Sequence, residues 1–451
     1  MSRTLFGTDG IRGVANQYPI IPEVMIRLGR AIVDCLPVGS EKKRIIIGKD
    51  TRISGDMIES AIAAGICSAS GNVFLTGIIP TPAVAYLTVT DSYDAGIVIS
   101  ASHNPYYDNG VKIFNRQGFK LSDELEQTIE DKVLDAPLLS NHLISKDIGV
   151  VTKLDDAASR YIDFLKGALP GNCSFTGLKV ILDCSNGAAY HIAPQVFSGL
   201  GAEVEILFAS PDGHNINDGC GSQHTEALQK TVVQHKAHIG LAFDGDADRL
   251  IAVDERGQKV TGDQILAVCA RYLKENSRLA NNVAVSTVMS NVGLHQALKE
   301  MNIRHVIADV GDRYVLEQMT AHQAVIGGED SGHMIFLDRH TSGDGILTAI
   351  RLMEVMQNTS RSLSDLVNVM RVYPQVLLNV KVRERVDLGN VPEIVEAIQK
   401  VERQLGDQGR VLVRYSGTQP LCRVMVEGPD QDDTHRFCRD IADVIERKLG
   451  I

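Results

Sequence analysis

The sequence lacks an excess of basic residues. Its 451 residues include 45 lysines and arginines against 56 aspartates and glutamates, which gives a formal net charge of −11. A general affinity for nucleic acids or anionic membranes requires a basic surface, so the charge balance argues against both as partners. It leaves room for a small anion held by a local group of arginines, and the acid excess suits a metal cation.

Closely spaced cysteine pairs and unbroken apolar segments are also missing. The eight cysteines include no CxxC pair, which excludes the metal and redox motifs built on that spacing, and we expect buried thiols in a reducing cytoplasm. The N-terminus has no apolar signal-peptide core. Residues 60–90 carry no charge, but glycines and prolines interrupt them, which a membrane helix does not favour. We therefore expect a cytoplasmic protein.

Short apolar strands alternate with helical stretches over most of the chain. Strands are predicted at residues 44–48, 73–75, 95–99, 179–183, 239–243 and 283–287. This alternation indicates parallel α/β layers, whose ligands bind at the loops that leave the carboxyl ends of the strands. After residue 373 the pattern changes to strands at 376–382, 411–414 and 423–427, with amphipathic helices at 392–405 and at the end of the chain.

These shifts predict an α/β protein of four domains around a central cleft. Three are similar mixed α/β sheet domains and the C-terminal one is α+β. The predicted boundaries give domains at residues 1–155, 156–256, 257–370 and 371–451.

The most specific local pattern is FDGDADR at residues 243–249, directly after a predicted strand. Asp244, Asp246 and Asp248 alternate, so on an extended loop their carboxylates project to one side and can converge on one cation. A ligand set of oxygens alone favours Mg²⁺, Mn²⁺ or Ca²⁺ over zinc. An EF-hand is excluded because Arg249 stands where the sharp turn needs glycine.

A second polar loop follows the predicted strand at 95–99. Within SASHNPYYDNGVKIF, Ser102 is a candidate nucleophile, and His103 and Lys112 are candidates for proton transfer. By residue chemistry alone, a simple polar turn is an equally good interpretation, since Pro105, Asn109 and Gly110 are ordinary turn residues.

Two further loops could bind the remaining parts of a substrate. In RYSGTQPLCR, Arg414 and Arg423 bracket hydroxyl and glycine residues, which is typical either of a phosphate cradle or of a plain turn between strands. In GGEDSGH, at residues 327–333, an acid next to Ser331 and His333 could bind sugar hydroxyls. A metal triad, a serine, a phosphate loop and a hydroxyl-binding loop together point to phosphoryl transfer on a polyhydroxyl substrate in an interdomain cleft.

At these motifs the sequence resembles the α-D-phosphohexomutase superfamily. SASHNP, DGDADR, GEDSGH and RYSGTQP stand in the order of that superfamily, one in each predicted domain. FGTDGIRG (6–13), GKDTRISG (48–55), PTPAVAYL (80–87) and VGDRYV (310–315) resemble its bacterial branch that acts on glucosamine phosphates. Two positions depart from the usual pattern: Gln419 stands where glutamate is common, and Asp330 where glutamine or asparagine is common.

The resemblance implies a role for each candidate residue. Ser102 would carry a phosphoryl group and bind one Mg²⁺ together with Asp244, Asp246 and Asp248. Arg12, Lys112 and His103 would serve proton transfer or transition-state support. The remaining residues would bind substrate: Arg249 the reacting phosphate; Glu329, Ser331 and His333 the sugar; and Arg414, Ser416, Gly417, Thr418 and Arg423 the non-reacting phosphate.

The reaction implied is conversion of glucosamine 6-phosphate to glucosamine 1-phosphate through a phosphoserine enzyme and a 1,6-bisphosphate, which also acts as activator. The product would feed UDP-N-acetylglucosamine synthesis. The alternatives are the same chemistry on glucose or mannose phosphate, a metal-dependent sugar phosphatase, or an inactive sugar-phosphate sensor. The partner is thus a small hexosamine phosphate, and the sequence leaves open whether the chain forms a homodimer.

Overall fold

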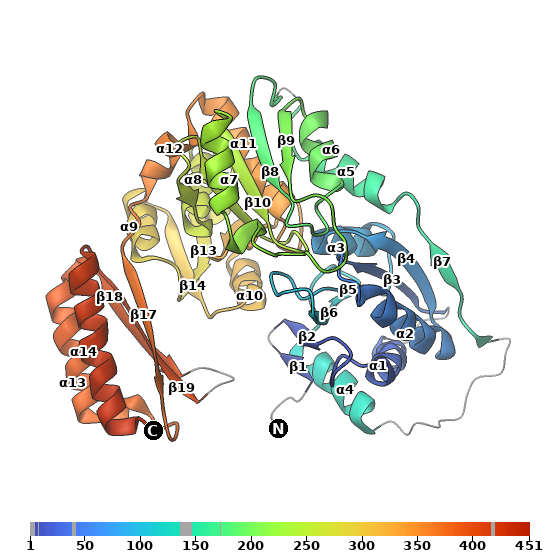
Figure 1. The fold of residues 1–451 in the computed structure, drawn as a ribbon, viewed down its shortest axis with the longest axis horizontal. Coiled ribbons are helices and arrows are strands. Elements are labelled where there is room, and N and C mark those ends of the chain that lie inside the picture. The colour runs from blue at the N-terminus through green and yellow to red at the C-terminus, as the bar shows by residue number, and fades with distance from the viewer. Residues whose placement is uncertain (1–4, 8, 38–41, 136–146, 172, 416–419) are drawn as a thin grey trace. The chain divides into compact units, whose positions relative to one another are not determined.

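A computed structural model describes residues 5–7, 9–37, 42–135, 147–171, 173–415 and 420–451 (Figure 1). The chain forms two compact units, which we describe separately. Unit 1 comprises residues Met1–Val288 and Val306–Val367, and unit 2 comprises Met289–His305 and Asn368–Ile451. No helix in the described ranges combines the length and apolar character needed to cross a bilayer.

The first sheet of unit 1 has seven strands in the order β1-β2-β6-β5-β3-β4-β7. Their bounds are Phe6–Gly7, Gly10–Val14, Asp108–Asn115, Ala95–Ile99, Arg44–Lys49, Asn72–Ile78 and Val151–Lys153. The helices of this part are α1 (Pro22–Cys35), α2 (Gly55–Ser68), α3 (Thr81–Thr90) and α4 (Asp123–Asp135). The predicted strands at 44–48, 73–75 and 95–99 are confirmed as β3, β4 and β5.

Two neighbouring strands of this sheet place two loops at one edge. β3 runs parallel to β5, with Lys49 opposite Ile99, so the loops that follow them leave the same edge. β5 is buried along its whole length, as its sequence AGIVI predicts for a central strand. β6 returns antiparallel to β5 and sets Lys112 opposite Val98.

The second sheet has the order β12-β11-β10-β8-β9. Its strands are Lys259–Val260, Leu250–Asp254, Ile239–Phe243, Lys179–Asp183 and Glu203–Leu207, and its helices are α5 (Ala157–Gly167), α6 (Ile192–Gly199) and α7 (Glu226–Gln234). β10 and β11 form an antiparallel hairpin in which Phe243 pairs with Leu250. Residues 244–249 are therefore the tight loop of that hairpin.

The third sheet has the order β14-β13-β15-β16. Its strands are Arg304–Ala308, Val283–Thr287, Ile326–Gly328 and Met334–Phe336, and the nearby helices of unit 1 are α8 (Gly262–Glu275), α10 (Asp312–His322), α11 (Gly345–Thr359) and α12 (Leu363–Leu366). Gly328 pairs with Met334 across the antiparallel β15 and β16, which makes residues 329–333 a second tight loop.

Unit 2 is an α+β structure together with α9 (Val292–Glu300). Its antiparallel sheet has the order β17-β19-β18, with bounds Gln375–Lys381, Leu421–Glu427 and Arg410–Tyr415. Figure 1 shows α13 (Pro392–Leu405) and α14 (Gln431–Leu449) side by side over this sheet. Ile394, Val401 and Ile441 are buried between these helices and the sheet. The predicted α+β character and the helix at 392–405 are confirmed.

Candidate functional site

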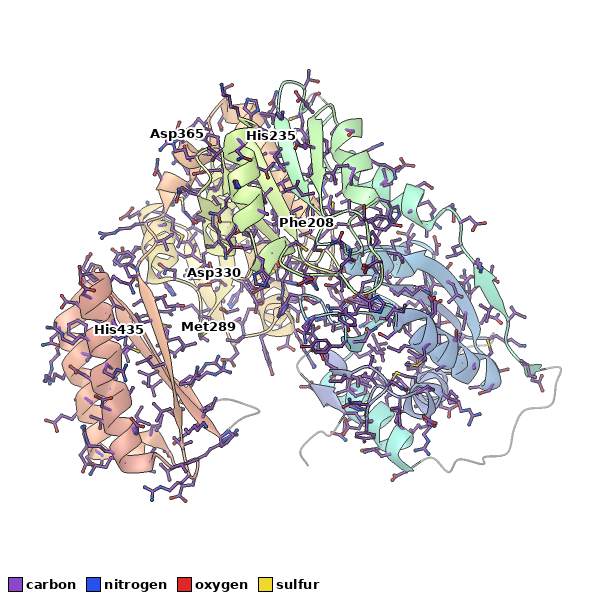
Figure 2. All side chains as sticks on the ribbon, viewed as in Figure 1. Phe208, His235, Met289, Asp330, Asp365 and His435 are labelled. Atoms are coloured by element: carbon purple, nitrogen blue, oxygen red, sulfur yellow. The ribbon has the colours of Figure 1, made fainter. Side chains whose placement is uncertain are left out.

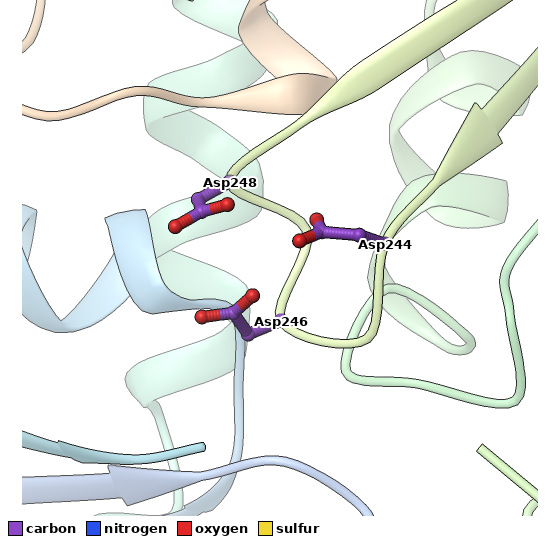
Figure 3. Close-up of side chains that lie close together, drawn as sticks. All are labelled: Asp244, Asp246 and Asp248. Carbon is purple, nitrogen blue, oxygen red and sulfur yellow. The ribbon is translucent and has the colours of Figure 1, made fainter. Parts of the chain in front are cut away.

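The three aspartates of the β10–β11 loop converge as the sequence predicts (Figure 3). Asp244, Asp246 and Asp248 are buried, and one oxygen of each lies within 4.8 Å of the others. Burial and the neighbouring charges of Asp248 and Asp246 raise the pKa of Asp244 well above its usual range. Three carboxylates packed this closely repel one another and therefore attract a cation.

The loop has oxygen atoms available for a metal ion. Oδ1 of Asp246 and Oδ1 of Asp248 are buried and have no hydrogen-bond partner among the described residues. Leaving a buried charged oxygen unpaired is costly, so these atoms fit a ligand that the protein itself does not supply. The all-oxygen donor set suits a hard divalent cation.

Ser102 lies directly against this triad. The residue follows β5 in a tight turn with a left-handed backbone, φ +53°. Its hydroxyl donates a hydrogen bond to Asp244 Oδ2 at 2.6 Å, and its side chain is buried. The candidate nucleophile and the candidate metal site, far apart in sequence, thus form one centre.

Lys112 occupies the other side of the triad. Its Nζ donates to Oδ2 of Asp246 at 2.8 Å and to Oδ2 of Asp248 at 3.0 Å. Burial alone would lower the pKa of Lys112, but the carboxylates of Asp246, Asp248 and Asp9 outweigh it and raise that pKa well above its usual range. Lys112 is therefore a fixed positive charge that binds the Oδ2 atoms of two aspartates and makes no hydrogen bond to their Oδ1 atoms.

His103 and Arg249 face each other beside Ser102. Arg249 donates to His103 Nδ1 at 2.7 Å, and that nitrogen lies 3.2 Å from Ser102 Oγ. Burial, followed by the charges of Arg249 and Arg12, lowers the pKa of His103 to about 4, so its imidazole is neutral at pH 7. Nε of Arg249 is buried without a hydrogen-bond partner in the described chain, which leaves the cation able to bind an anion.

The β15–β16 loop lies next to the β10–β11 loop that carries the three aspartates, called the metal loop below. Arg249 and His333 form an isolated antiparallel bridge, and His333 Nδ1 is 3.7 Å from Asp248 Oδ1. Glu329 accepts a hydrogen bond from the N–H of Gly311 at 2.9 Å and one from the Ser331 hydroxyl at 3.3 Å. The structure thus brings Glu329, Ser331 and His333 to the same centre as Ser102.

Asp330, the unusual residue of that loop, is exposed; it is labelled in Figure 2. Its Oδ1 lies 3.4 Å from the N–H of Asp263, in the first turn of α8, and its carbonyl accepts the N–H of Gly262 at 3.0 Å. Its carboxylate thus lies beside the first turn of α8, where backbone N–H groups favour negative charge.

The sequence did not predict a series of ion pairs that lies beside the site. Arg12 forms an ion pair with Asp9, and Asp9 also pairs with Lys120. Lys120 in turn forms an ion pair with Asp312 at 2.5 Å. Burial would raise the pKa of Asp9, but Lys112, Lys120 and Arg12 outweigh it and hold that pKa well below its usual range. Only Arg12 was a candidate, because nothing in the spacing of these residues shows that they meet.

The two candidate arginines of unit 2 are cross-strand neighbours. Arg414 on β18 is the register partner of Arg423 on β19. Like charges directly opposite each other destabilise a sheet unless an anion lies between them. Arg423 Nε is buried and has no hydrogen-bond partner in the described part of the chain. Ser416, Gly417, Thr418 and Gln419 lie outside the described residues.

Four family models match the chain in succession. Their descriptions are phosphoglucomutase/phosphomannomutase alpha/beta/alpha domain I for residues 3–138, domain II for 159–257, domain III for 261–373, and the C-terminal domain for 377–444.

Curated relatives and solved structures agree with these matches. A phosphoglucosamine mutase of Syntrophobacter fumaroxidans is 54% identical over 99% of this chain and 100% of its own length. The phosphoglucosamine mutase of Syntrophus aciditrophicus is 53% identical over 99% of both chains.

Among solved structures, a phosphoglucomutase/phosphomannomutase family protein from Burkholderia thailandensis superposes with a TM-score of 0.79 at 24% identity, covering 98% of this chain and 97% of its own. An N-acetylphosphoglucosamine mutase from Aspergillus fumigatus, solved with GlcNAc-6P and magnesium, gives a TM-score of 0.70 at 16% identity over 99% and 96% of the two chains. At these identities the structures show the shared fold.

Proposed function

The chain belongs to the phosphoglucomutase/phosphomannomutase family, and from that premise we propose that it interconverts glucosamine 6-phosphate and glucosamine 1-phosphate through a phosphoryl group carried on Ser102. The chain is an isomerase of the phosphotransferase type that catalyses the phosphohexomutase reaction. The observation that carries the proposal is the Ser102 hydroxyl, which lies 2.6 Å from Asp244 within the buried triad. The choice of glucosamine rests on the relatives at 53% and 54% identity.

The family depends on a metal ion, and we assign Mg²⁺ to Asp244, Asp246 and Asp248, with the phosphate on Ser102 as a further ligand. The Oδ1 atoms of Asp246 and Asp248, which are buried without a hydrogen bond from the described residues, support this assignment. When bound, the cation would neutralise charge on the phosphoryl group in transit.

The first transfer moves the phosphoryl group from the enzyme to the sugar. The hydroxyl at C1 of glucosamine 6-phosphate attacks phosphorus, the P–Oγ bond of phosphoserine 102 breaks, and the hydroxyl proton is passed to Oγ. The 1,6-bisphosphate then turns end for end. Oγ attacks the 6-phosphoryl group, the P–O6 bond breaks, and the proton returns to O6.

The charged residues around Ser102 would provide positioning and charge neutralisation, on which phosphoryl transfer mainly depends. Arg249 would bind the reacting phosphate, because its buried Nε makes no hydrogen bond within the described residues and its position beside His103 suits an anion. The neutral imidazole of His103 would orient Arg249, while Lys112 and Arg12 would supply fixed positive charge next to the transferring group.

The sugar and its second phosphate would bind to the other two loops. Glu329, Ser331 and His333 would contact the sugar hydroxyls, and the Arg414–Arg423 pair would hold the non-reacting phosphate with Ser416, Gly417 and Thr418.

A 1,6-bisphosphate that escapes before the second transfer leaves Ser102 without phosphate. Added bisphosphate would therefore act as an activator by recharging the serine. We place the reaction in the cytoplasm, where its product would feed UDP-N-acetylglucosamine synthesis.

A coupled assay for glucosamine 1-phosphate, with Mg²⁺ and a trace of 1,6-bisphosphate, tests the proposal. Ser102→Ala should lower kcat about 1,000-fold or more, because the phosphoryl carrier is lost. Intact-mass measurement should find one phosphoryl group on the parent protein and none on the variant. Ser60→Ala, at an exposed serine of α2, is the matched control and should retain the parent rate.

Three outcomes would contradict the proposal. Turnover retained by Ser102→Ala would remove the phosphoserine step. Equal or better kcat/KM on mannose or glucose phosphate would remove the glucosamine specificity. Steady release of inorganic phosphate without stimulation by bisphosphate would indicate a phosphatase.

A further inference from the structure

The loop after β3, residues 50–54, has no role in the reaction described above, yet it reaches the Ser102 turn. Arg52 is buried there, and its side chain and that of Asp50 are fully covered. Arg52 pairs with the Asp50 carboxylate, and Arg52 Nη2 donates to the carbonyl of Ser102 at 3.1 Å and to that of Asn104 at 2.6 Å. The parallel pairing of β3 with β5 explains this meeting, because both loops leave the same sheet edge.

Asn217, from the second sheet's part of unit 1, binds the same two carbonyls. Its Nδ2 donates to Ser102 O at 2.9 Å and to Asn104 O at 3.0 Å. Its own backbone, with φ +60°, is left-handed, and its N–H is fixed by the carbonyl of Ser185 at 2.9 Å. Two side chains from distant parts of the sequence thus donate four hydrogen bonds to the turn that carries the nucleophile.

These four bonds hold a backbone that a serine does not readily adopt. Residues other than glycine are uncommon at positive φ, and Ser102 has φ +53°. Such a conformation persists only where the surroundings fix it. If the carbonyls of Ser102 and Asn104 were released, the turn could relax, and the 2.6 Å contact of Ser102 Oγ with Asp244 would lengthen.

The metal loop leaves this turn little freedom on its other side. A Cβ added to Gly245, between two of the triad aspartates, would lie 2.6 Å from the Ser102 carbonyl and 2.9 Å from Asn217 Nδ2. The clamped carbonyl is therefore packed between Arg52, Asn217 and the metal loop. A shift of the turn would therefore displace the metal ligands as well as Ser102.

The contact between the first and second sheets of unit 1 does not depend on this arrangement. Thr51 Oγ1 donates to the carbonyl of Asn186 at 2.6 Å, and the N–H of Ile53 donates to the carbonyl of Gly213 at 3.0 Å. Both contacts link the 50–54 loop to the second sheet's loops without touching the Ser102 turn. The bonds of Arg52 and Asn217 act on the nucleophile turn itself.

We propose that Arg52 and Asn217 are positioning residues that together hold Ser102 in its reactive left-handed conformation against the metal site. The proposal rests on the role proposed for Ser102 as phosphoryl carrier. Neither residue needs to touch substrate. Their removal should therefore slow both phosphoryl transfers while substrate still binds.

The test compares Arg52→Ala, Arg52→Lys and Asn217→Gly with the parent enzyme in the coupled assay. Glycine is chosen at 217 because it keeps the left-handed backbone while removing the amide. We expect kcat to fall by about 10-fold to 100-fold, since a misplacement of about 1 Å can have that effect. KM should stay within about two-fold of the parent value, because neither variant removes a contact with the substrate. Guanidinium ion added to Arg52→Ala should restore part of kcat.

Arg44→Ala is the matched control. Arg44 lies at the opposite end of β3, where its guanidinium donates to the carbonyl of Asp91 at 3.0 Å and so makes the same type of bond away from the site. This variant should lower the melting temperature without lowering kcat of the folded enzyme. The double variant Arg52→Lys, Asn217→Gly should lose less than the product of the two single losses, because the two residues share their acceptors.

Clear results would overturn the proposal. An unchanged kcat in folded Arg52→Lys and Asn217→Gly would contradict it. So would a fall in kcat that only accompanies a fall in melting temperature and that guanidinium does not rescue. The rate at which 1,6-bisphosphate phosphorylates Ser102, followed by intact mass, separates this failure from that of the proposed function. A parent enzyme that never takes up the phosphoryl group refutes the function, whereas a parent that is charged at the same rate as the Arg52 and Asn217 variants refutes only the positioning role.

Discussion

Asp344 shows what burial does to a single carboxyl group near the site. The residue caps α11: one carboxylate oxygen accepts the N–H of Leu347 at 2.9 Å, and the other accepts the hydroxyl of Tyr161 at 2.7 Å. Burial outweighs these two bonds and raises the pKa of Asp344 from its ordinary 3.8 to about 6. The folded protein therefore binds a proton here between pH 4 and pH 6 that the unfolded chain has already lost.

This shift has a definite sign for stability. The contribution of Asp344 is fully present below its unfolded pKa, falls as pH rises toward about 6, and then stays lost. The loss amounts to roughly 3 kcal/mol at neutral pH. Asp344→Asn keeps an oxygen for Leu347 and does not ionise, so its melting temperature relative to the parent should rise between pH 4.5 and pH 7. A difference that stays constant across this range would contradict the assigned shift.

The residues that could be predicted from sequence are those whose chemistry is local. Asp244, Asp246 and Asp248 are separated by one residue each, so one loop brings them together whatever the rest of the fold does. Ser102 and His103 follow a predicted strand, where ligand-binding loops are expected.

Other residues of the site depend on tertiary pairing. Asp9, Lys120 and Asp312 meet only through the fold, as do Arg52 and Asn217. The motif around Arg52 was visible in the sequence, but its target was not, because the target is a pair of backbone carbonyls.

Among the elements, α1 and α2 approach each other through two glycines. A Cβ on Gly65 would lie 2.1 Å from the carbonyl oxygen of Ile26, and one on Gly29 would lie 2.4 Å from that of Ile62. The obstacles are backbone atoms, which cannot move aside as a flexible side chain can. These two glycines therefore set the distance between α1 and α2, the second of which begins directly after the 50–54 loop.

Gly65→Ala should destabilise unit 1 because the two helices must separate. Overpacking of a filled interior usually costs about 1–3 kcal/mol, and a backbone obstacle places this site at the upper end. The melting temperature measures it. Gly167→Ala is the matched control: it also lies in a helix, but a Cβ there would have no atom within 4 Å, so it should leave stability unchanged or raise it. Equal melting temperatures for the two variants would contradict the close approach.

Short strands were harder to predict than long ones. The predicted strands at 179–183, 239–243 and 283–287 are confirmed as β8, β10 and β13, and each contains a run of buried apolar residues that the sequence shows. β15 and β16, with three residues each, gave no such pattern. They nevertheless form the hairpin that presents Glu329, Ser331 and His333.

For the whole molecule, part of the net charge of −11 is concentrated in three buried carboxylates. Lys112 offsets only part of that charge, so a divalent cation should bind the folded chain and not the unfolded one. At a Mg²⁺ concentration about 100 times Kd, such binding adds about 3 kcal/mol of stability. The melting temperature should therefore rise on adding Mg²⁺ and fall on adding EDTA.

Two variants make this metal prediction specific. Asp246→Asn should abolish the Mg²⁺-dependent rise, because it removes a ligand charge. Asp254→Asn should retain it, because Asp254 is buried on β11 outside the triad and binds the N–H groups of Arg256 and Gln258 at 2.9 and 2.8 Å. A parent protein that does not respond to Mg²⁺, or an Asp246→Asn variant that responds equally, would refute the assignment of the triad.

The left-handed backbone at Ser102 also limits which amino acids can serve as the carrier. Threonine offers the same hydroxyl chemistry, but its branched Cβ makes a φ near +53° far less accessible than it is for serine. A threonine at position 102 would have to give up either that turn or the alignment of its oxygen with Asp244. Backbone geometry, and not nucleophilicity, thus decides between the two hydroxyl side chains at the centre of this molecule.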